Sequence, residues 1–240
     1  MLQALPPPLF LSVLVALAAN GVAASGGRTD VGPLIHRFED HYRGARTLQA
    51  AFLERYTENG RATRVESGTA FFRRPGKMRF EYESPEANLF LVDGKNAWFY
   101  VPADHTVTRV PSKLSTDWRT PLALLAGEMK VSRICAQVEA SRSEKPEAPE
   151  NAVIHCVLKT VGAKAEKGAP KGSALPDATL APAVDFELVT ATGELVRVLA
   201  RDPGGIGIEF HFANWHSDPP VADSLFRFVV PPGVAIVNGE

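Results

Sequence analysis

The sequence has almost no net charge and only two cysteines, and both scarcities limit what the protein can be. Its 240 residues carry 26 Lys and Arg against 27 Asp and Glu, a net charge of −1, with no block of either sign. Nucleic acid and anionic membrane surfaces are therefore poor candidate partners, because both are bound through concentrated positive charge. The cysteines form no Cys/His set at metal-site spacing, so the sequence predicts no metal centre built on them.

Catalytic motifs are missing as well. The chain has no G-x-S-x-G, H-E-x-x-H, Walker loop or G-x-G-x-x-G. The histidines are scattered; His36 and His41, for example, lie five apart in a predicted helix and do not share a face. Glu81 and Glu83 alternate as a carboxylate pair would, but the neighbouring Arg79 indicates a solvated charged face. We therefore expect neither an enzyme nor a metal or cofactor, although catalytic residues need not be close in sequence.

The first 24 residues contain no charged side chain, and an apolar run spans residues 9–19. That run has the length of a signal-peptide core and is short for a membrane span, while Val22 and Ala24 suit a cleavage site. We predict that residues 1–24 are a cleaved signal peptide and that the protein is exported and soluble. A membrane anchor is the alternative, whereas a lipid anchor would need a cysteine after the apolar run.

Cys135 and Cys156 lie in two short apolar runs on either side of the polar residues 141–151. If these runs pair as a hairpin, both cysteines fall near its middle. An oxidising compartment then favours a disulfide, and two buried free thiols are the alternative.

Apolar residues make up 45% of the chain and predict a globular protein, and the alternating and helical segments along the chain predict that it is mainly β with short helices. Apolar positions every four residues predict a helix over residues 30–43, and Pro121 begins a short helix that Gly127 ends. Residues 161–182 have almost no large apolar side chain and are predicted to be a flexible loop. Twelve segments predict an antiparallel sheet of about ten strands or slightly more. They lie at residues 48–56, 68–72, 78–83, 89–92, 97–101, 106–110, two cysteine-bearing runs, 184–189, 194–200, 206–212 and 226–230. Whether these strands form two packed sheets or one curved sheet is left open by the pattern.

Four stretches, in order, carry a resemblance to a known family. The first is Phe52–Leu53–Glu54, which is similar to F-x-Q, and the second is G-x-x-x-x-x-R-P at 68–75, followed by the strand 78–82 and Pro85. The third is D-G-K-x-x-W-x-Y-x-P at 93–102. The fourth is T-P-x-x-L-L at 120–125, together with F-x-F-x-x-P-x-G-V at 226–234. This set resembles the periplasmic outer-membrane lipoprotein carriers of the LolA type. Glu54 stands where Gln is usual, Met78 where an aromatic is common, and 161–182 resembles an insertion.

The resemblance implies a single domain over residues 25–240, an incomplete (unclosed) β-barrel with a helical lid over a hydrophobic cavity, and a periplasmic location. It implies a monomer that takes acylated lipoproteins from an inner-membrane ABC transporter to an outer-membrane receptor. A regulatory or scaffold protein of the same fold is the alternative. Residues expected to line the cavity are Leu34, Phe38, Phe52, Phe72, Met78, Phe80, Tyr82, Phe90, Trp98, Tyr100, Leu122 and Leu125.

Arg74 has the same strand parity as Met78, Phe80 and Tyr82, which is unexpected for a charged group. A guanidinium on an apolar face is costly unless its donors are satisfied. By resemblance Arg74 is the arginine that bonds the carbonyls of the lid helices, and helix ends near residues 42–44 and 125–127 could supply them. An ordinary rim arginine stacked on Phe72 is the alternative.

Overall fold

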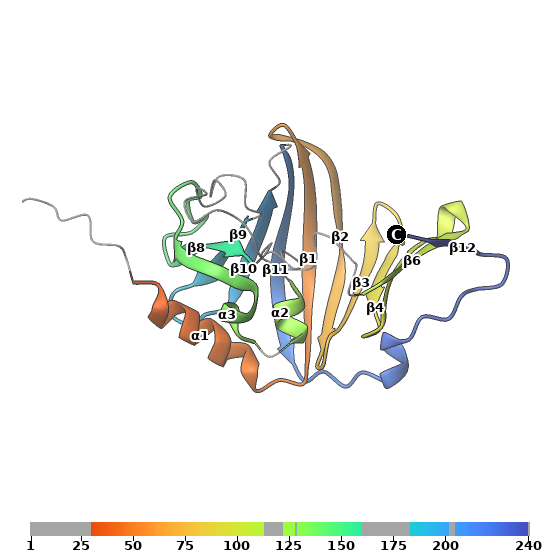
Figure 1. Ribbon diagram of the computed structural model, residues 1–240, viewed down its shortest axis with the longest axis horizontal. Coiled ribbons are helices and arrows are strands. Elements are labelled where there is room, and N and C mark those ends of the chain that lie inside the picture. The colour runs from red at the N-terminus through yellow and green to blue at the C-terminus, as the bar shows by residue number, and fades with distance from the viewer. Residues whose placement is uncertain (1–29, 113–121, 128, 160–182, 202–204, 240) are drawn as a thin grey trace, which may run out of the picture.

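The computed structural model describes residues 30–112, 122–127, 129–159, 183–201 and 205–239, and within them twelve strands form one sheet. Its order is β12-β6-β5-β4-β3-β2-β1-β11-β10-β9-β8-β7, and the two end strands do not pair with each other, so the barrel is incomplete (Figure 1). The predicted fold class is confirmed. The strands form one curved sheet and not two packed sheets. The strands are β1 (Thr47–Glu58), β2 (Arg61–Arg73), β3 (Lys77–Ser84), β4 (Leu89–Val92), β5 (Asn96–Val101), β6 (Thr106–Pro111), β7 (Cys135–Ala140), β8 (Asn151–Leu158), β9 (Ala183–Val189), β10 (Leu195–Arg201), β11 (Ile206–Ser217) and β12 (Ala235–Asn238).

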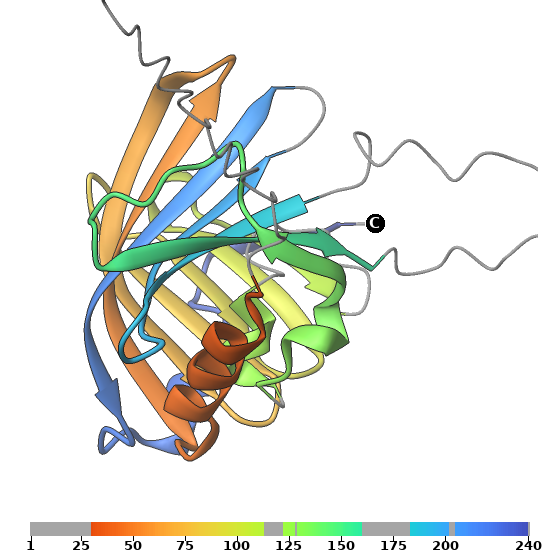
Figure 2. The same ribbon diagram turned by 90° about the vertical axis from the view of Figure 1, so that its left-hand side faces the viewer.

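The helices α1 (Gly32–Arg43), α2 (Ala123–Ala126) and α3 (Val131–Ile134) lie against the concave face of this sheet (Figure 2). Directly paired residues of neighbouring strands point to the same face. The pairs Phe52↔Phe212 and Phe80↔Phe90 therefore place four aromatic rings on the concave side. These rings and the apolar faces of the helices form one buried cluster.

Helix α1 forms where the periodicity predicts it. Pro33 occupies its first turn, and the Asp30 carboxylate accepts a hydrogen bond from the Gly32 N–H at 2.9 Å. Leu34, Phe38 and Tyr42 are all buried on one side. That side rests directly on the β9–β10 turn.

Gly193 in this turn has φ +77°, and a Cβ added there would lie 2.5 Å from backbone atoms of Arg37 and Phe38. Only glycine allows the helix backbone to approach the turn so closely.

Two predictions about secondary structure are wrong. The first cysteine-bearing run was expected to be a strand throughout, but Val131–Ile134 is helical and the strand begins at Cys135. The second is the expected strand at 226–230; instead Asp223–Phe226 forms the 3₁₀ turn η3, and β12 follows at Ala235–Asn238. Strand β12 pairs parallel with β6, which is an exception in an otherwise antiparallel sheet.

The convex face carries a buried charged group centred on Arg197. Its Nε donates to Glu187 at 2.8 Å and one terminal nitrogen donates to Glu209 at 2.9 Å. Arg55 donates to the other Glu209 oxygen at 2.9 Å. His211, whose Nε2 lies 3.5 Å from that carboxylate, and then Arg197 lower the pKa of Glu209 to about 2 from 4.5, against the opposing effect of burial.

The lowered pKa of Glu209 predicts a pH-dependent contribution to stability. Because the folded-state pKa lies below the ordinary 4.5, the contribution is complete above that pH and is lost as the pH falls through about 2. We expect Glu209→Gln to lower the free energy of unfolding by about 1–3 kcal/mol at pH 7. The deficit should shrink progressively below pH 4.5 in urea titrations followed by circular dichroism. Glu58→Gln, an exposed position on β1, is the matched control; an E209Q deficit that stays constant down to pH 2 would contradict the assignment.

Candidate functional site

The guanidinium of Arg74 bonds the C-terminal end of α1. Arg74 follows the last residue of β2, and one terminal nitrogen donates to the carbonyls of Arg43 at 2.8 Å and Ala45 at 2.5 Å. The other terminal nitrogen donates to the Tyr42 carbonyl at 2.8 Å. The last carbonyls of a helix have no partner within it, so a cation with several donors satisfies them well. We call this set of three hydrogen bonds the Arg74 clamp.

The negatively charged side chain of Asp218 also binds the connection between α1 and β1. Its carboxylate accepts hydrogen bonds from the backbone N–H groups of Arg46 at 2.8 Å and Thr47 at 3.1 Å. These two N–H groups lower the pKa of Asp218, so the side chain is ionised at neutral pH. Burial lowers the pKa of Arg74, and the negative charge of Asp218 opposes that effect. The connection between α1 and β1 is thus held through both its carbonyls and its N–H groups.

The second expected set of carbonyls, near residues 125–127, is bonded in another way. The Gly76 N–H, and not the Arg74 side chain, donates to the Ala126 carbonyl at 2.7 Å. The β2–β3 turn therefore contacts the ends of both α1 and α2.

The apolar interior lies between the concave face and the three helices. Phe38, Phe72, Phe80 and Leu122 are at most 1% exposed, and Phe52 is 4% exposed. Aromatic rings contact one another across the strands, with centroids 5.2 Å apart for Phe52 and Phe80 and 5.7 Å apart for Phe72 and Phe80. Ten of the residues expected to line a cavity belong to this buried cluster: Leu34, Phe38, Phe52, Phe72, Met78, Phe80, Tyr82, Phe90, Leu122 and Leu125.

Comparison with known proteins finds a family model and several relatives that are similar to this chain. Residues 43–148 match the family model described as outer membrane lipoprotein carrier protein LolA. The outer-membrane lipoprotein carrier protein of Chromobacterium violaceum is 27% identical over 233 residues, covering 97% of this chain and 99% of that protein. The protein of the same name from Nitrosomonas europaea is 29% identical over 208 residues, covering 81% of this chain and 84% of its own length.

Over these residues the chain is similar to LolA-type proteins. Among solved structures, an uncharacterized conserved protein from Thermus thermophilus aligns with a TM-score of 0.49 and 13% identity, covering 86% of this chain and 97% of that one. The LolA family is named for carrying lipoproteins and not for a catalysed reaction. In the described part of the chain, no helix is both long and apolar enough to span a bilayer.

Two of the residues expected to line the interior lie elsewhere. The register pairs Phe90 with Phe99, so Phe99 points to the concave side while Trp98 and Tyr100 point to the convex side. There Trp98 stacks on Phe228 with ring centroids 5.2 Å apart. The expected place of Trp98 and Tyr100 is therefore corrected: every residue of this strand segment is apolar, so the sequence offered no parity by which to choose.

Sequence reasoning missed Phe210, Phe212 and Trp215 as part of this interior. Trp215 contacts Tyr42 and Phe72, with ring centroids at 5.0 and 6.1 Å. The alternation over residues 206–212 already contained the signal for the two phenylalanines.

Glu54, the departure from the usual Gln, is 1% exposed and accepts a hydrogen bond from the Tyr82 hydroxyl at 2.5 Å. The interior thus includes a buried carboxylate, whose cost of burial the hydrogen bond offsets in part.

The predicted disulfide is present. Cys135 and Cys156 are joined with a Cα–Cα distance of 5.4 Å, so the free-thiol alternative is excluded. The predictions for residues 1–24 and 161–182, and for the start of the helix at Thr120 and Pro121, lie outside the described residues.

A group of potential metal ligands occurs on the convex face among the described residues. Glu147, Glu209 and His211 lie close enough together to hold an ion. Arg55 and Arg197 each donate to Glu209 at 2.9 Å, and two guanidiniums would repel a cation bound there. This group therefore serves as an ion-pair network.

The Arg74 clamp predicts a measurable loss of stability in Arg74→Leu, which keeps an apolar side chain and removes all donors. We expect the free energy of unfolding to fall by about 2–4 kcal/mol, since charge-assisted hydrogen bonds contribute about 1.5–3 kcal/mol each and water replaces part of them. Arg73→Leu is the matched control, because the ion-pair partner of Arg73 is Asp223, whose side chain is 88% exposed. Urea unfolding measures both variants. Equal losses of the free energy of unfolding would show that the clamp stabilises the protein no more than the ion pair of Arg73 does.

Proposed function

We propose that this protein carries lipoproteins, holding their acyl chains between the concave face of the sheet and the helices. The observation that supports this is the buried aromatic interior closed by helices that hydrogen bonds hold at the Arg74 clamp. The curated relatives that share nearly the whole chain are named outer-membrane lipoprotein carrier proteins.

The proposal includes a route. Residues 25–240 act as one carrier domain in the periplasm after removal of a signal peptide at residues 1–24. As a monomer, the protein receives acylated lipoproteins from an inner-membrane ABC transporter and delivers them to an outer-membrane receptor. No cofactor or catalysed reaction enters this route.

Magnitudes explain why a carrier is needed. Each buried CH₂ of an acyl chain contributes roughly 0.8 kcal/mol, so a lipoprotein with two or three chains does not leave a membrane for water unaided. The carrier must supply comparable apolar surface. Because Phe38, Phe72 and Phe80 are fully buried here, acyl chains can reach them only after the helices move away from the sheet.

Tryptophan fluorescence tests where the chains bind. Trp215 packs against the apolar interior, whereas Trp98 lies on the convex face and stacks on Phe228. Two single-tryptophan proteins can therefore report on the concave and the convex side of the sheet separately. One keeps Trp215 and the other keeps Trp98, with the remaining tryptophans, Trp118 included, replaced by Phe. A diacylated lipopeptide with brominated acyl chains should quench Trp215 strongly and leave Trp98 almost unchanged. Equal quenching at both sites, or none at Trp215, would contradict the proposed binding face.

Release of cargo tests the Arg74 clamp. If loading opens the clamp, the hydrogen bonds favour the empty closed form, and their loss raises the affinity for cargo. We expect Arg74→Leu to accept lipoprotein but to transfer it to outer-membrane vesicles about tenfold more slowly, because 1.4 kcal/mol corresponds to a factor of ten. Copurified acylated protein identified by mass spectrometry verifies loading, and Arg73→Leu is the control. An unchanged transfer rate would remove Arg74 from the mechanism.

A further inference from the structure

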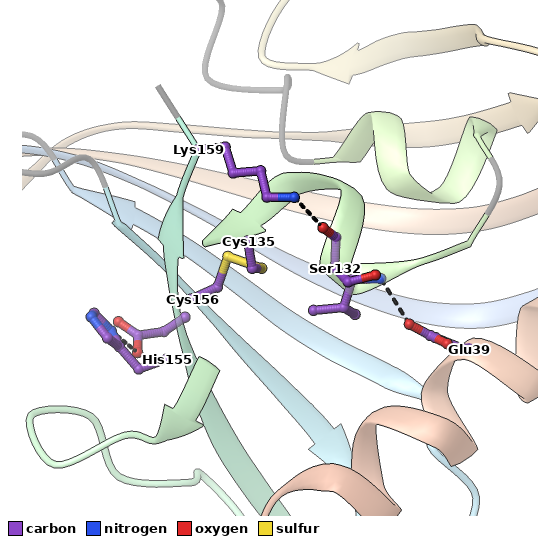
Figure 3. Close-up of a disulfide and its surroundings, with 8 residues drawn as sticks. Glu39, Ser132, Cys135, His155, Cys156 and Lys159 are labelled. Atoms are coloured by element: carbon purple, nitrogen blue, oxygen red, sulfur yellow. Dashed lines mark hydrogen bonds and ion pairs between the residues drawn. A yellow bond between two sulfur atoms is a disulfide. The ribbon is translucent and has the colours of Figure 1, made fainter. Parts of the chain in front are cut away.

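Helices α1 and α3 are joined by one buried hydrogen bond. The Val131 N–H donates to a Glu39 carboxylate oxygen at 2.8 Å, across 92 residues of sequence. Glu39 is 9% exposed and Val131 is 1% exposed. Figure 3 shows Glu39 reaching from α1 toward the start of α3. We call this contact the α1–α3 seam.

Glu39 satisfies a group that α3 cannot satisfy itself. The first N–H groups of a helix have no acceptor within it, and the N-cap residue Lys130 provides no side-chain cap. A buried carboxylate is costly unless it is hydrogen-bonded. Its other oxygen accepts a long hydrogen bond, 3.4 Å, from the half-exposed Arg43. The seam therefore satisfies a backbone N–H group of α3 and a buried carboxylate of α1.

Helix α3 is fixed to the sheet covalently. The disulfide from Cys135, the residue after α3, reaches Cys156 in β8 (Figure 3). The Lys159 backbone N–H donates to the Ile134 carbonyl at 2.8 Å, and its ammonium donates to the Ser132 carbonyl at 2.5 Å. Moving α3 away from β8 would break both hydrogen bonds from Lys159, and the disulfide at the adjacent Cys135 limits how far the end of α3 can move.

Helix α1, by contrast, is held to the rest of the described chain without a covalent crosslink. Its contacts include the Arg74 clamp, the seam, a 3.0 Å hydrogen bond from the Leu195 N–H to the Tyr42 hydroxyl, a 3.2 Å hydrogen bond from the Arg37 guanidinium to the Thr190 carbonyl, and apolar packing. Each of these can break and re-form. The helices above the interior thus consist of a covalently anchored part, α3, and a reversibly held part, α1.

We propose that Glu39 is a positioning residue for cargo loading, and that acyl chains enter when α1 separates from the disulfide-anchored α3 at the seam. The Glu39–Val131 bond then breaks together with the Arg74 clamp, while α3 stays on the sheet. This inference rests on the proposed function and specifies which part of the helical cover moves.

The seam can be tested in the empty full-length protein, without any cargo. Hydrogen–deuterium exchange is followed at the Val131 amide. Glu39→Ala removes the acceptor and should speed exchange about tenfold, since one hydrogen bond contributes about 1 kcal/mol or more. Glu39→Gln keeps an acceptor oxygen and should restore most of the protection. Asp40→Ala is the matched control, because this exposed neighbour carries the same charge on the same helix and forms its ion pair with Arg43. Unchanged exchange in Glu39→Ala would overturn the proposal.

Cargo then tests the movement, with a synthetic dipalmitoylated lipopeptide as probe. In the wild-type protein, loading should expose the Val131 amide at least tenfold while amides of β7 and β8 keep their protection. Removing the anchor with the double variant Cys135→Ala, Cys156→Ala should let α3 follow α1, so that Val131 keeps its protection on loading. Protection of Val131 in the loaded wild-type protein would overturn the proposal. Failure to bind the lipopeptide at all would instead contradict the proposed function, and the exchange result in the empty protein distinguishes the two.

Discussion

The hydrogen bonds from Arg74 to the end of α1 are the contact on which the closed arrangement of helix and sheet depends. Arg74 donates to the Tyr42 and Arg43 carbonyls at the end of α1 and to the Ala45 carbonyl of the short connection between α1 and β1. The N–H groups of this connection are bonded by Asp218, which arrives from the far end of β11. Two side chains distant in sequence thus satisfy both halves of the backbone. Because unsatisfied buried polar groups are costly, this joint fixes where α1 lies over the interior.

Alternation and helical spacing are strong enough in this chain to predict the concave face and α1. Met78, Phe80 and Tyr82 share a face because they are two residues apart on a strand, and the unexpected parity of Arg74 indicated that its guanidinium needs acceptors, which the carbonyls at the end of α1 supply to its two terminal nitrogens. The motif glycine Gly68 also has a physical basis, since a Cβ there would lie within 1.9 Å of the Glu81 carbonyl oxygen. These features depend on residues close together in sequence, which is why they can be read from it.

The features that could not be predicted depend on tertiary contacts. The orientation of Trp98 is set by pairing with β4 and by Phe228, whereas its own neighbours on the strand are all apolar. Val131 and Ile134 are residues that favour strands, yet a carboxylate from α1 accepts the first N–H of a helical turn there. Strand β12 pairs parallel with β6, and no local pattern specifies a parallel partner. In each case a distant side chain or strand decides between local alternatives that differ little in energy.

The polar character of the joint suits a carrier better than an apolar one would. The contribution of about 2–4 kcal/mol expected for the clamp is comparable with the burial of roughly three to five CH₂ groups at about 0.8 kcal/mol each. In the proposed carrier, a clamp of this size would hold the empty form closed and could still be opened by the burial of part of an acyl chain. An apolar closure would offer a continuous range of partial contacts and would compete with acyl chains for the same surface. Hydrogen bonds to backbone carbonyls at the edge of the interior are either formed or broken, and they leave Phe72 and Phe80 available to the cargo.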